Sequence, residues 1–206
     1  MHTLLAQTRA GLRALLVLTV LVGVLYPLGI WLVSRVPGLH DNAEGSVVVR
    51  DGRAVGSAHI GIDPVPADPD ADPWFHTRPS AGSSGPLGPG DPAASGGSNK
   101  GQSDPDLTAL VNERKDLIAV REGVPRDRVP PDAVTASASG LDPHISPAYA
   151  ELQVPRVARV TGLSEDRVRA LVAEHTSDRV LWFLGEPAVN VLALNLAVQA
   201  EAGSSG

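Results

Sequence analysis

Residues 14–33 read ALLVLTVLVGVLYPLGIWLV, and this run decides how the chain is organised. No charged residue interrupts it, and a helix of this length, at about 1.5 Å per residue, matches the roughly 30 Å hydrocarbon core of a bilayer. A cleaved signal peptide, the alternative, has a shorter apolar region and a small-residue cleavage site, whereas residues 32–38 read LVSRVPG. The sequence therefore predicts one transmembrane helix over residues 14–33.

Charged residues around this span predict its orientation. Arg9 and Arg13 precede it, whereas Arg35 alone follows it closely, before Asp41 and Glu44. Because basic residues concentrate on the cytoplasmic side, we expect a single-pass protein of the cell membrane with residues 1–13 in the cytoplasm. Residues 34–206 then form an extracytoplasmic domain.

Composition argues against several kinds of site and partner. The chain has no cysteine, so a disulfide framework, a thiolate metal site and a thiol nucleophile are excluded. Its six histidines show no metal-ligand spacing, and we expect no metal site. Three of the 17 Lys and Arg residues precede residue 36, whereas all 23 Asp and Glu residues follow it. The exported part therefore has a net charge of −9. So acidic a domain is not expected to bind nucleic acid.

The exported part contains signals for strands, turns and long loops. Asp51-Gly52 between two β-rich runs predicts a hairpin over residues 46–61. The short apolar run Val180 to Leu184 predicts a buried strand. Residues 80–105 are dominated by Gly, Ser and Pro, and we expect one long ordered loop rather than a linker between two domains.

Capping residues predict the helices of the same region. They favour a helix over residues 106–121 and further helices that begin after Ser146, Ser164 and Asn190. Pro155 is expected to interrupt the helix that begins after Ser146, because proline removes a backbone donor. The fold class is therefore α/β (α+β), with a small sheet, short helices and long loops.

An acidic, proline-rich stretch follows the hairpin. Asp63, Asp68, Asp70 and Asp72 alternate with prolines in DPVPADPDADPW, residues 63–74. Such a segment is typical of a solvated, extended loop that needs no ligand. The alternative is an outer rim that attracts cations.

The stretch SGLDPHISPAYA, residues 139–150, combines Ser139, Asp142 and His144, the residue types of a hydrolase. A catalytic triad converges from distant parts of a chain, however, and no G-x-S-x-G elbow is present. Gly140 and the prolines instead indicate a rigid turn. The surroundings of Lys100 do not form a phosphate-binding loop either. We assign no catalytic residue, and a membrane-anchored hydrolase remains only as an alternative.

Several motifs in one order resemble a known family over nearly the whole chain. They are Arg78-Pro79-Ser80, SGGSN at 95–99, VTASASGLDPHISP at 134–147, QVPRVA at 153–158, GEP at 185–187 and VNVL at 189–192. The sequence resembles the C subunit of the Kdp-type potassium-transporting P-type ATPase. It departs from that pattern at Lys100, Gln102 and Asp104, where the family more often has Leu, Pro and Asn.

The resemblance implies a non-catalytic accessory subunit of an ATP-driven potassium importer. Its partners would be a channel-like potassium-translocating subunit, a P-type ATP-hydrolysing subunit and often a very small membrane subunit. The family is described as a catalytic chaperone that raises the ATP affinity of the hydrolysing subunit. An exported domain would act on that subunit through the membrane, by biasing its conformation.

The resemblance also implies functional residues. No cofactor is expected to bind firmly, although ATP would be held in a ternary complex with the hydrolysing subunit. The residues that it implies for ATP are Ser137, Ser139, Gly140 and Gln153. The residues that it implies for partner contacts or for the structural motif are Arg78, Pro79, Ser80, Ser98, Asn99, Asp142, Pro143, His144, Ser146, Gly185, Glu186 and Asn190. The alternative function is an outer cap over the translocating subunit.

Overall fold

The computed structural model describes residues 2–204, with side chains described for residues 3–203. The chain divides into two compact units, one that ends at Val47 and one that begins at Val48. The first carries the apolar run, and the second contains the helices and the sheet of a folded domain.

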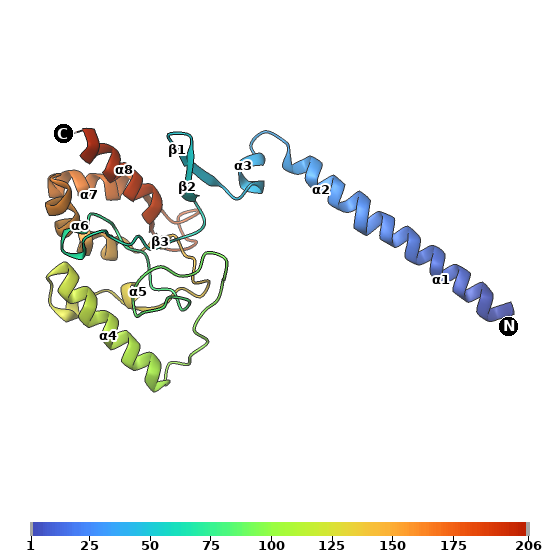
Figure 1. Ribbon diagram of the computed structural model, residues 1–206, viewed down its shortest axis with the longest axis horizontal. Coiled ribbons are helices and arrows are strands. Elements are labelled where there is room, and N and C mark those ends of the chain that lie inside the picture. The colour runs from blue at the N-terminus through green and yellow to red at the C-terminus, as the bar shows by residue number, and fades with distance from the viewer. Residues whose placement is uncertain (1, 205–206) are drawn as a thin grey trace. The chain divides into compact units, whose positions relative to one another are not determined.

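The first unit is dominated by one long apolar helix. It comprises α1 (His2–Val20), a π-helical turn (Leu21–Leu25) and α2 (Tyr26–Ser34), which Figure 1 shows as a single rod. The wide turn precedes Pro27, which has no N–H to donate, and such turns accommodate a proline within a helix. An 18-residue stretch of the helix Thr3–Ser34 has a mean hydropathy of 2.4, and none of that stretch is buried within the protein. The helix is therefore long and apolar enough to cross a membrane once.

A short helix and a hairpin follow the long helix. Helix α3 (His40–Ala43) lies between Arg35 and Glu44, whose side chains form an ion pair at 3.0 Å. Strands β1 (Val47–Arg50) and β2 (Arg53–Ser57) then form the expected hairpin. Asp51 and Gly52 have φ values of 51° and 74°, the conformation that a two-residue hairpin turn requires.

The domain is a mixed fold, as the sequence predicted. Strands β3 (His144–Ile145), β5 (Ala188–Asn190) and β4 (Thr176–Ser177) form an antiparallel sheet with β5 in the middle. Its helices are α4 (Pro105–Glu122), α5 (Pro131–Val134), α6 (Pro147–Thr161), α7 (Glu165–Glu174) and α8 (Val191–Ser204). Helix α6 packs against α4 and α7, and α7 packs against α8 (Figure 1).

Local capping explains where these helices begin. The Asp104 carboxylate accepts from the N–H groups of Asp106 and Leu107, and the Ser146 hydroxyl accepts from Tyr149 N–H. Ser164 and Asn190 cap α7 and α8 in the same way, through Arg167 N–H and Ala193 N–H. The predicted helix starts are therefore confirmed. Residues between 80 and 104 contain no helix or strand, as expected for the long loop.

Two predictions about local structure are wrong. Helix α6 continues through Pro155 without interruption, because Val154, Val157 and Ala158 are buried on its inner face while Pro155 itself faces outward. The run Val180 to Leu184 is not a buried strand but an exposed hairpin tip. Five apolar residues in a row do not distinguish a core strand from a projecting loop.

The organising feature of the domain is an extended segment, residues 72–80, that pairs with no strand in the described part of the chain. Its backbone is bound instead by side chains. Phe75 exchanges two hydrogen bonds with the side-chain amide of Asn195, at 2.8 and 2.9 Å. His76 does the same with Gln153, at 2.8 and 3.3 Å. We call residues 72–80 the central segment.

Charged side chains complete this anchoring below the surface. Arg156, 4% exposed, donates to the backbone carbonyls of Asp72 and Trp74 and pairs with the carboxylates of Asp72 and Glu122. Both ring nitrogens of His76 also face carboxylates, Asp63 at 3.1 Å and Asp72 at 2.6 Å. The desolvated charges are thus matched pair by pair, which burial requires.

The environment of Asp72 shows how strongly these pairs are coupled. Burial opposes its ionisation, but the His76 hydrogen bond and charge, the Trp74 N–H and Arg156 outweigh that cost and lower its pKa. Asp72 therefore adds stability above its unfolded-state pKa, and this contribution is lost as the pH falls through the folded value. Burial likewise raises the pKa of Tyr149 to about 12, so the phenol next to Arg121 stays neutral.

We expect Arg156→Met to destabilise the protein by about 3–5 kcal/mol, because it removes the guanidinium that Asp72 and Glu122 share and leaves these buried carboxylates with only His76 and Arg121. The matched control is Arg169→Met, since Arg169 pairs with Glu151 and Glu165 on the surface. That variant should lose less than about 1 kcal/mol. Urea unfolding of the detergent-solubilised chain measures both, and equal losses would contradict the role of Arg156.

Candidate functional site

Seven of the sixteen predicted site residues fall in one segment, residues 135–146, which is hydrogen-bonded to three loops elsewhere in the domain. Ser137 N–H donates to Pro79 O at 3.0 Å, and Gly96 N–H donates to Ser139 O at 2.8 Å. Leu141 O accepts from Gly61 N–H at 2.8 Å. We call residues 135–146 the joint, because each of these contacts ties it to a different loop.

Ser137, Ser139 and Gly140 form a closed turn. The Ser137 hydroxyl accepts from the N–H groups of Ser139 and Gly140, both at 3.2 Å, and lies 3.0 Å from the Ser139 hydroxyl. Gly140 has φ of 72°, and a Cβ there would lie 2.9 Å from Gly96 O, so only glycine fits. The turn is therefore held by its own groups.

Arg78, Asp142 and His144 lie on the more exposed side of the joint. Asp142 accepts from Arg78 at 3.1 Å and from His144 N–H at 3.0 Å, and its carboxylate is 3.4 Å from the His144 ring. The His144 side chain is 38% exposed. This edge offers a cation, a carboxylate and an imidazole to a partner surface.

The joint does not show the geometry of a hydrolase. His144 has an aspartate beside it, but within residues 2–204 no hydrogen bond joins His144 to either Ser137 or Ser139. The Ser139 hydroxyl instead accepts from Leu141 N–H at 3.1 Å. A nucleophile–base contact, which such a mechanism requires, therefore has no support here.

Gln153 lies away from the surface of the joint. Its side chain is 0% exposed, and its amide is used by the His76 backbone and by Arg156. The N–H groups that Ser137 and Gly140 would offer to a phosphate are also bonded internally. Contact with ATP through these residues would require those hydrogen bonds to be exchanged.

The remaining predicted residues occupy three places. Pro79 and Ser80 are buried in the central segment, and Pro143 O accepts from Val191 N–H at 2.9 Å. Ser146 and Asn190 are helix caps, and Asn190 also donates to Ala58 O at 3.0 Å. The exposed ones are Ser98, Asn99, Gly185 and Glu186.

The acidic loop is only partly solvated. Asp63 and Asp72 are 9% and 2% exposed, and both are bound to His76. Asp68 and Asp70 remain exposed, with the Asp68 carboxylate capping a short turn through Asp70 N–H. The expectation of a wholly solvated loop is therefore wrong for Asp63 and Asp72, because both bind the buried His76 ring and Asp72 also pairs with the buried Arg156.

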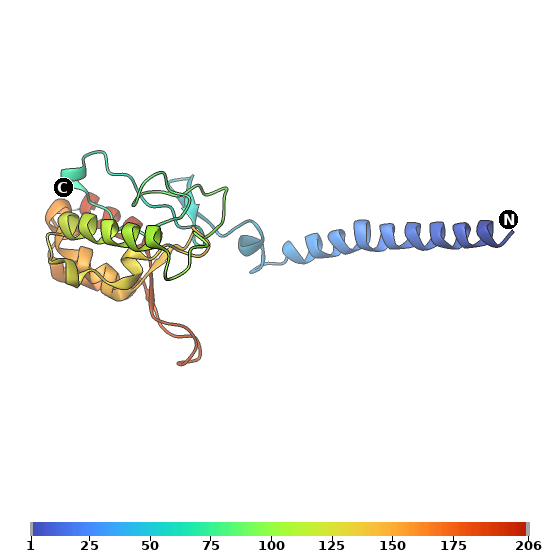
Figure 2. The same ribbon diagram turned by 90° about the horizontal axis from the view of Figure 1, so that it is seen from below.

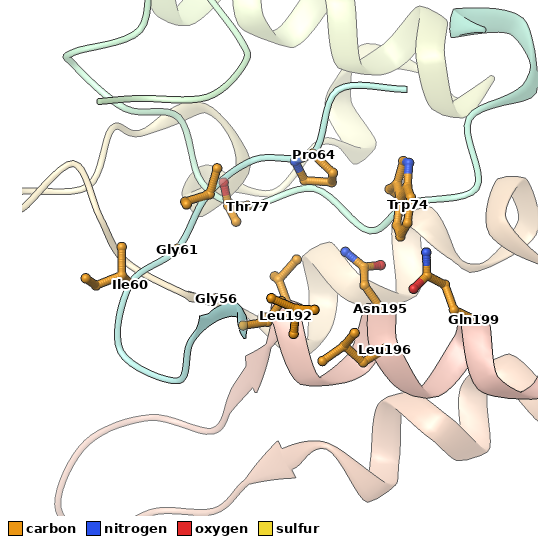
Figure 3. A pocket seen from close by; sticks show the side chains of 13 residues that line it. Gly56, Ile60, Gly61, Pro64, Trp74, Thr77, Leu192, Asn195, Leu196 and Gln199 are labelled. Carbon is orange, nitrogen blue, oxygen red and sulfur yellow. The ribbon is translucent and has the colours of Figure 1, made fainter. Parts of the chain in front are cut away.

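Sequence reasoning did not identify an apolar groove of about 330 Å³ beside the joint (Figure 3). In this view Leu192 and Leu196 of α8 face Ile60 and Pro64, and Trp74 closes one end. Its few polar side chains include Thr77, Asn195 and Gln199. The one signal in the sequence is Gly56, where a Cβ would lie 2.8 Å from the Leu192 side chain, so the glycine allows close packing.

The described residues contain no group of three or more acidic or histidine side chains arranged to hold a metal ion. The acidic side chains that lie close to other charged groups inside the domain form ion pairs, such as those of Asp72 and Glu122 with Arg156. The site described by these residues is a protein surface around the joint and the groove.

Comparison with known proteins extends over both units of the chain. A family model described as the c chain of the K+-transporting ATPase matches residues 8–200. A potassium-transporting ATPase KdpC subunit of Kineococcus radiotolerans is 51% identical over 200 residues, which cover 97% of this chain and 96% of that protein. The KdpC subunit of Sorangium cellulosum is 49% identical, with 95% and 98% covered, and that of Mycobacterium tuberculosis is 45% identical, with 93% and 97% covered.

Two glycines at the joint provide a test of its packing. A Cβ on Gly61 would lie 2.8 Å from Pro143 Cα and closer still to the Asp142 carbonyl, whereas a Cβ on Gly96 meets nothing within 4 Å. We expect Gly61→Ala to destabilise the chain by about 1–3 kcal/mol or more and Gly96→Ala to have little effect. Thermal unfolding of both variants decides this, and a Gly61→Ala protein as stable as the parent would refute the close packing.

Proposed function

Because the chain belongs to the KdpC family of potassium-transporting ATPase subunits, we propose that it is the accessory subunit of an ATP-driven, high-affinity potassium importer. It performs no catalysis alone. It assembles with a channel-like potassium-translocating subunit, a P-type ATP-hydrolysing subunit and, in some complexes, a very small fourth membrane subunit. Its own roles are to stabilise this complex and to raise the ATP affinity of the hydrolysing subunit.

The membrane helix supports the first part of this proposal. One apolar helix, Thr3–Ser34, suits a single-pass anchor in the cell membrane. Arg9 and Arg13 lie in the first turns of this helix, before its uncharged run 14–33, and favour a cytoplasmic N-terminus and an exported domain. A single helix supplies no ion path, so the pore belongs to another chain.

The joint is the observation that carries the proposal. Its backbone is fixed by contacts with Gly61, Pro79 and Gly96, while the His144 ring and the Asp142 carboxylate stay accessible. A rigid segment with an exposed charged edge suits a docking surface, because little ordering is lost on binding. Contact with a partner there would influence the ATPase by favouring one of its conformations.

ATP remains a proposed ligand of the ternary complex rather than of this chain alone. The residues concerned are Ser137, Ser139, Gly140 and Gln153, and their polar groups already bond within the domain. The same residues support the conformation of the joint. We therefore favour an indirect effect on ATP affinity over a direct contact with the nucleotide.

The outer-cap alternative has narrower support. A domain at −9 raises the local cation concentration. Only Asp68 and Asp70 of the acidic loop are exposed, however, since Asp63 and Asp72 serve the interior. Neutralising all four aspartates would therefore damage the domain and would not isolate an effect on potassium.

We expect His144→Ala to lower recovery of the other subunits in a pull-down or to raise the ATP KM of the purified complex. Because the side chain is 38% exposed, the variant should keep its stability within about 0.5 kcal/mol. His40→Ala, an exposed histidine of α3, is the control. Normal assembly together with an unchanged ATP KM would refute the docking role of the joint.

A further inference from the structure

The hairpin between β4 and β5 ends in an exposed apolar tip, residues 180–184. Figure 2 shows this hairpin projecting from the domain, well away from the neighbouring helices. The sequence is Val-Leu-Trp-Phe-Leu, and the five residues are 66%, 65%, 86%, 55% and 48% exposed. A contiguous set of large apolar side chains is unfavourable in water and indicates a surface that is covered in the working protein.

The backbone of the tip is shaped to hold these side chains outward. Leu181 and Trp182 have φ values of 53° and 64°, a left-handed conformation that normally falls to glycine or asparagine. Two bulky residues in this conformation are strained, and such strain persists where it has a use. The Trp182 and Phe183 rings pack edge to face at 5.2 Å, which makes one compact aromatic unit.

Hydrogen bonds occupy three of the five backbone N–H groups of the tip. Val180 and Leu184 exchange two hydrogen bonds of 2.9 Å, and Trp182 N–H donates to Arg179 O at 3.3 Å. At the neck, Arg179 pairs with Glu186 at 2.5 Å, so the nearest cation is neutralised. A segment with no charged side chain leaves bulk water at lower cost, and at the interface headgroup water satisfies the remaining backbone groups.

We propose that the apolar tip inserts into the interfacial zone of the bilayer that holds the chain's own transmembrane helix. Trp and Phe beside aliphatic residues are the composition of segments that bind at the boundary of headgroups and acyl chains. The paired Arg179 and Glu186 then lie at headgroup level. Without a basic cluster, insertion depends on apolar contact, and neutral phosphatidylcholine is a sufficient surface.

The length of the connection favours lipid over a distant partner. The membrane helix ends at Ser34 and β1 begins at Val47, and each residue between them spans at most about 3.6 Å. The domain therefore stays close to the membrane surface, where the effective concentration of lipid is high. The bilayer is the one apolar surface that the anchor guarantees to be within reach.

Single-cysteine labelling tests this proposal directly, because the natural chain contains no cysteine. Phe183→Cys carries an environment-sensitive fluorophore at the tip, and Val120→Cys, on α4 and 83% exposed, is the matched control. The full-length chain is reconstituted alone into phosphatidylcholine vesicles. Quenching by spin-labelled lipid and by aqueous iodide is then compared at the two positions.

We expect the label at position 183 to be quenched by spin-labelled lipid and its iodide quenching constant to fall at least about threefold below that at position 120. Equal iodide access at both positions, without lipid quenching, overturns the proposal. The assembled complex provides a second arm. The label at position 183 could become shielded from iodide only when the complex assembles, still without quenching by spin-labelled lipid. That result also overturns the proposal, and it assigns the tip to a contact with another subunit.

A second variant separates folding from insertion. Leu181→Asn with Trp182→Gly places residues in the turn that favour its positive φ values, so the isolated chain should be at least as stable. Lipid quenching of the label at position 183 should nevertheless be lost, because most of the apolar surface is gone. Lipid quenching that persists in this stable variant contradicts insertion through the tip.

Discussion

Three consecutive backbone N–H groups in the middle of the central segment are bound by side-chain oxygens, and the domain depends on these bonds. Phe75 donates to Asn195, His76 donates to Gln153 and Thr77 donates to Asp63, each at 2.8 Å. An extended chain buried among helices has no strand to satisfy its polar groups, and an unpaired buried group is costly. The three acceptors belong to α8, α6 and the acidic loop, so these bonds join elements that are far apart in sequence.

The joint and the groove both follow from this anchoring. The central segment continues to Pro79, whose carbonyl accepts from Ser137 N–H and so fixes the start of the joint. Trp74, Thr77 and Asn195 line the groove, which therefore has the same supports. The charged pairs of Arg156 hold the other end of the segment. The proposed docking surface is accordingly rigid because the chain beneath it is fixed by hydrogen bonds.

Local signals in the sequence predicted much of this structure. Asp51-Gly52 requires only its own turn conformation, and Asp104, Ser164 and Asn190 cap helices that begin beside them. The apolar run near the N-terminus predicted one membrane helix, and the order of motifs identified the family, which the comparisons confirm. The turn, the helix caps and the membrane helix each depend on residues that are close in sequence.

Features that depend on distant partners were not predicted. Asp63 and Asp72 read as a solvated acidic stretch, because only the fold brings Arg156 and His76 to them. Strand β3 has two residues and pairs with β5 across more than forty positions, too short a run for any periodicity. The tip at Val180 to Leu184 is as apolar as a core strand, and composition says nothing of which side faces water.

Native-state amide hydrogen exchange tests most directly whether side chains fix the central segment. The amides of Phe75, His76 and Thr77 lie outside every helix and strand. If their bonds to Asn195, Gln153 and Asp63 hold the domain together, they will exchange as slowly as the buried turns of α6, and only through global unfolding. Exchange as fast as that of the exposed stretch at residues 65–68 would contradict this account.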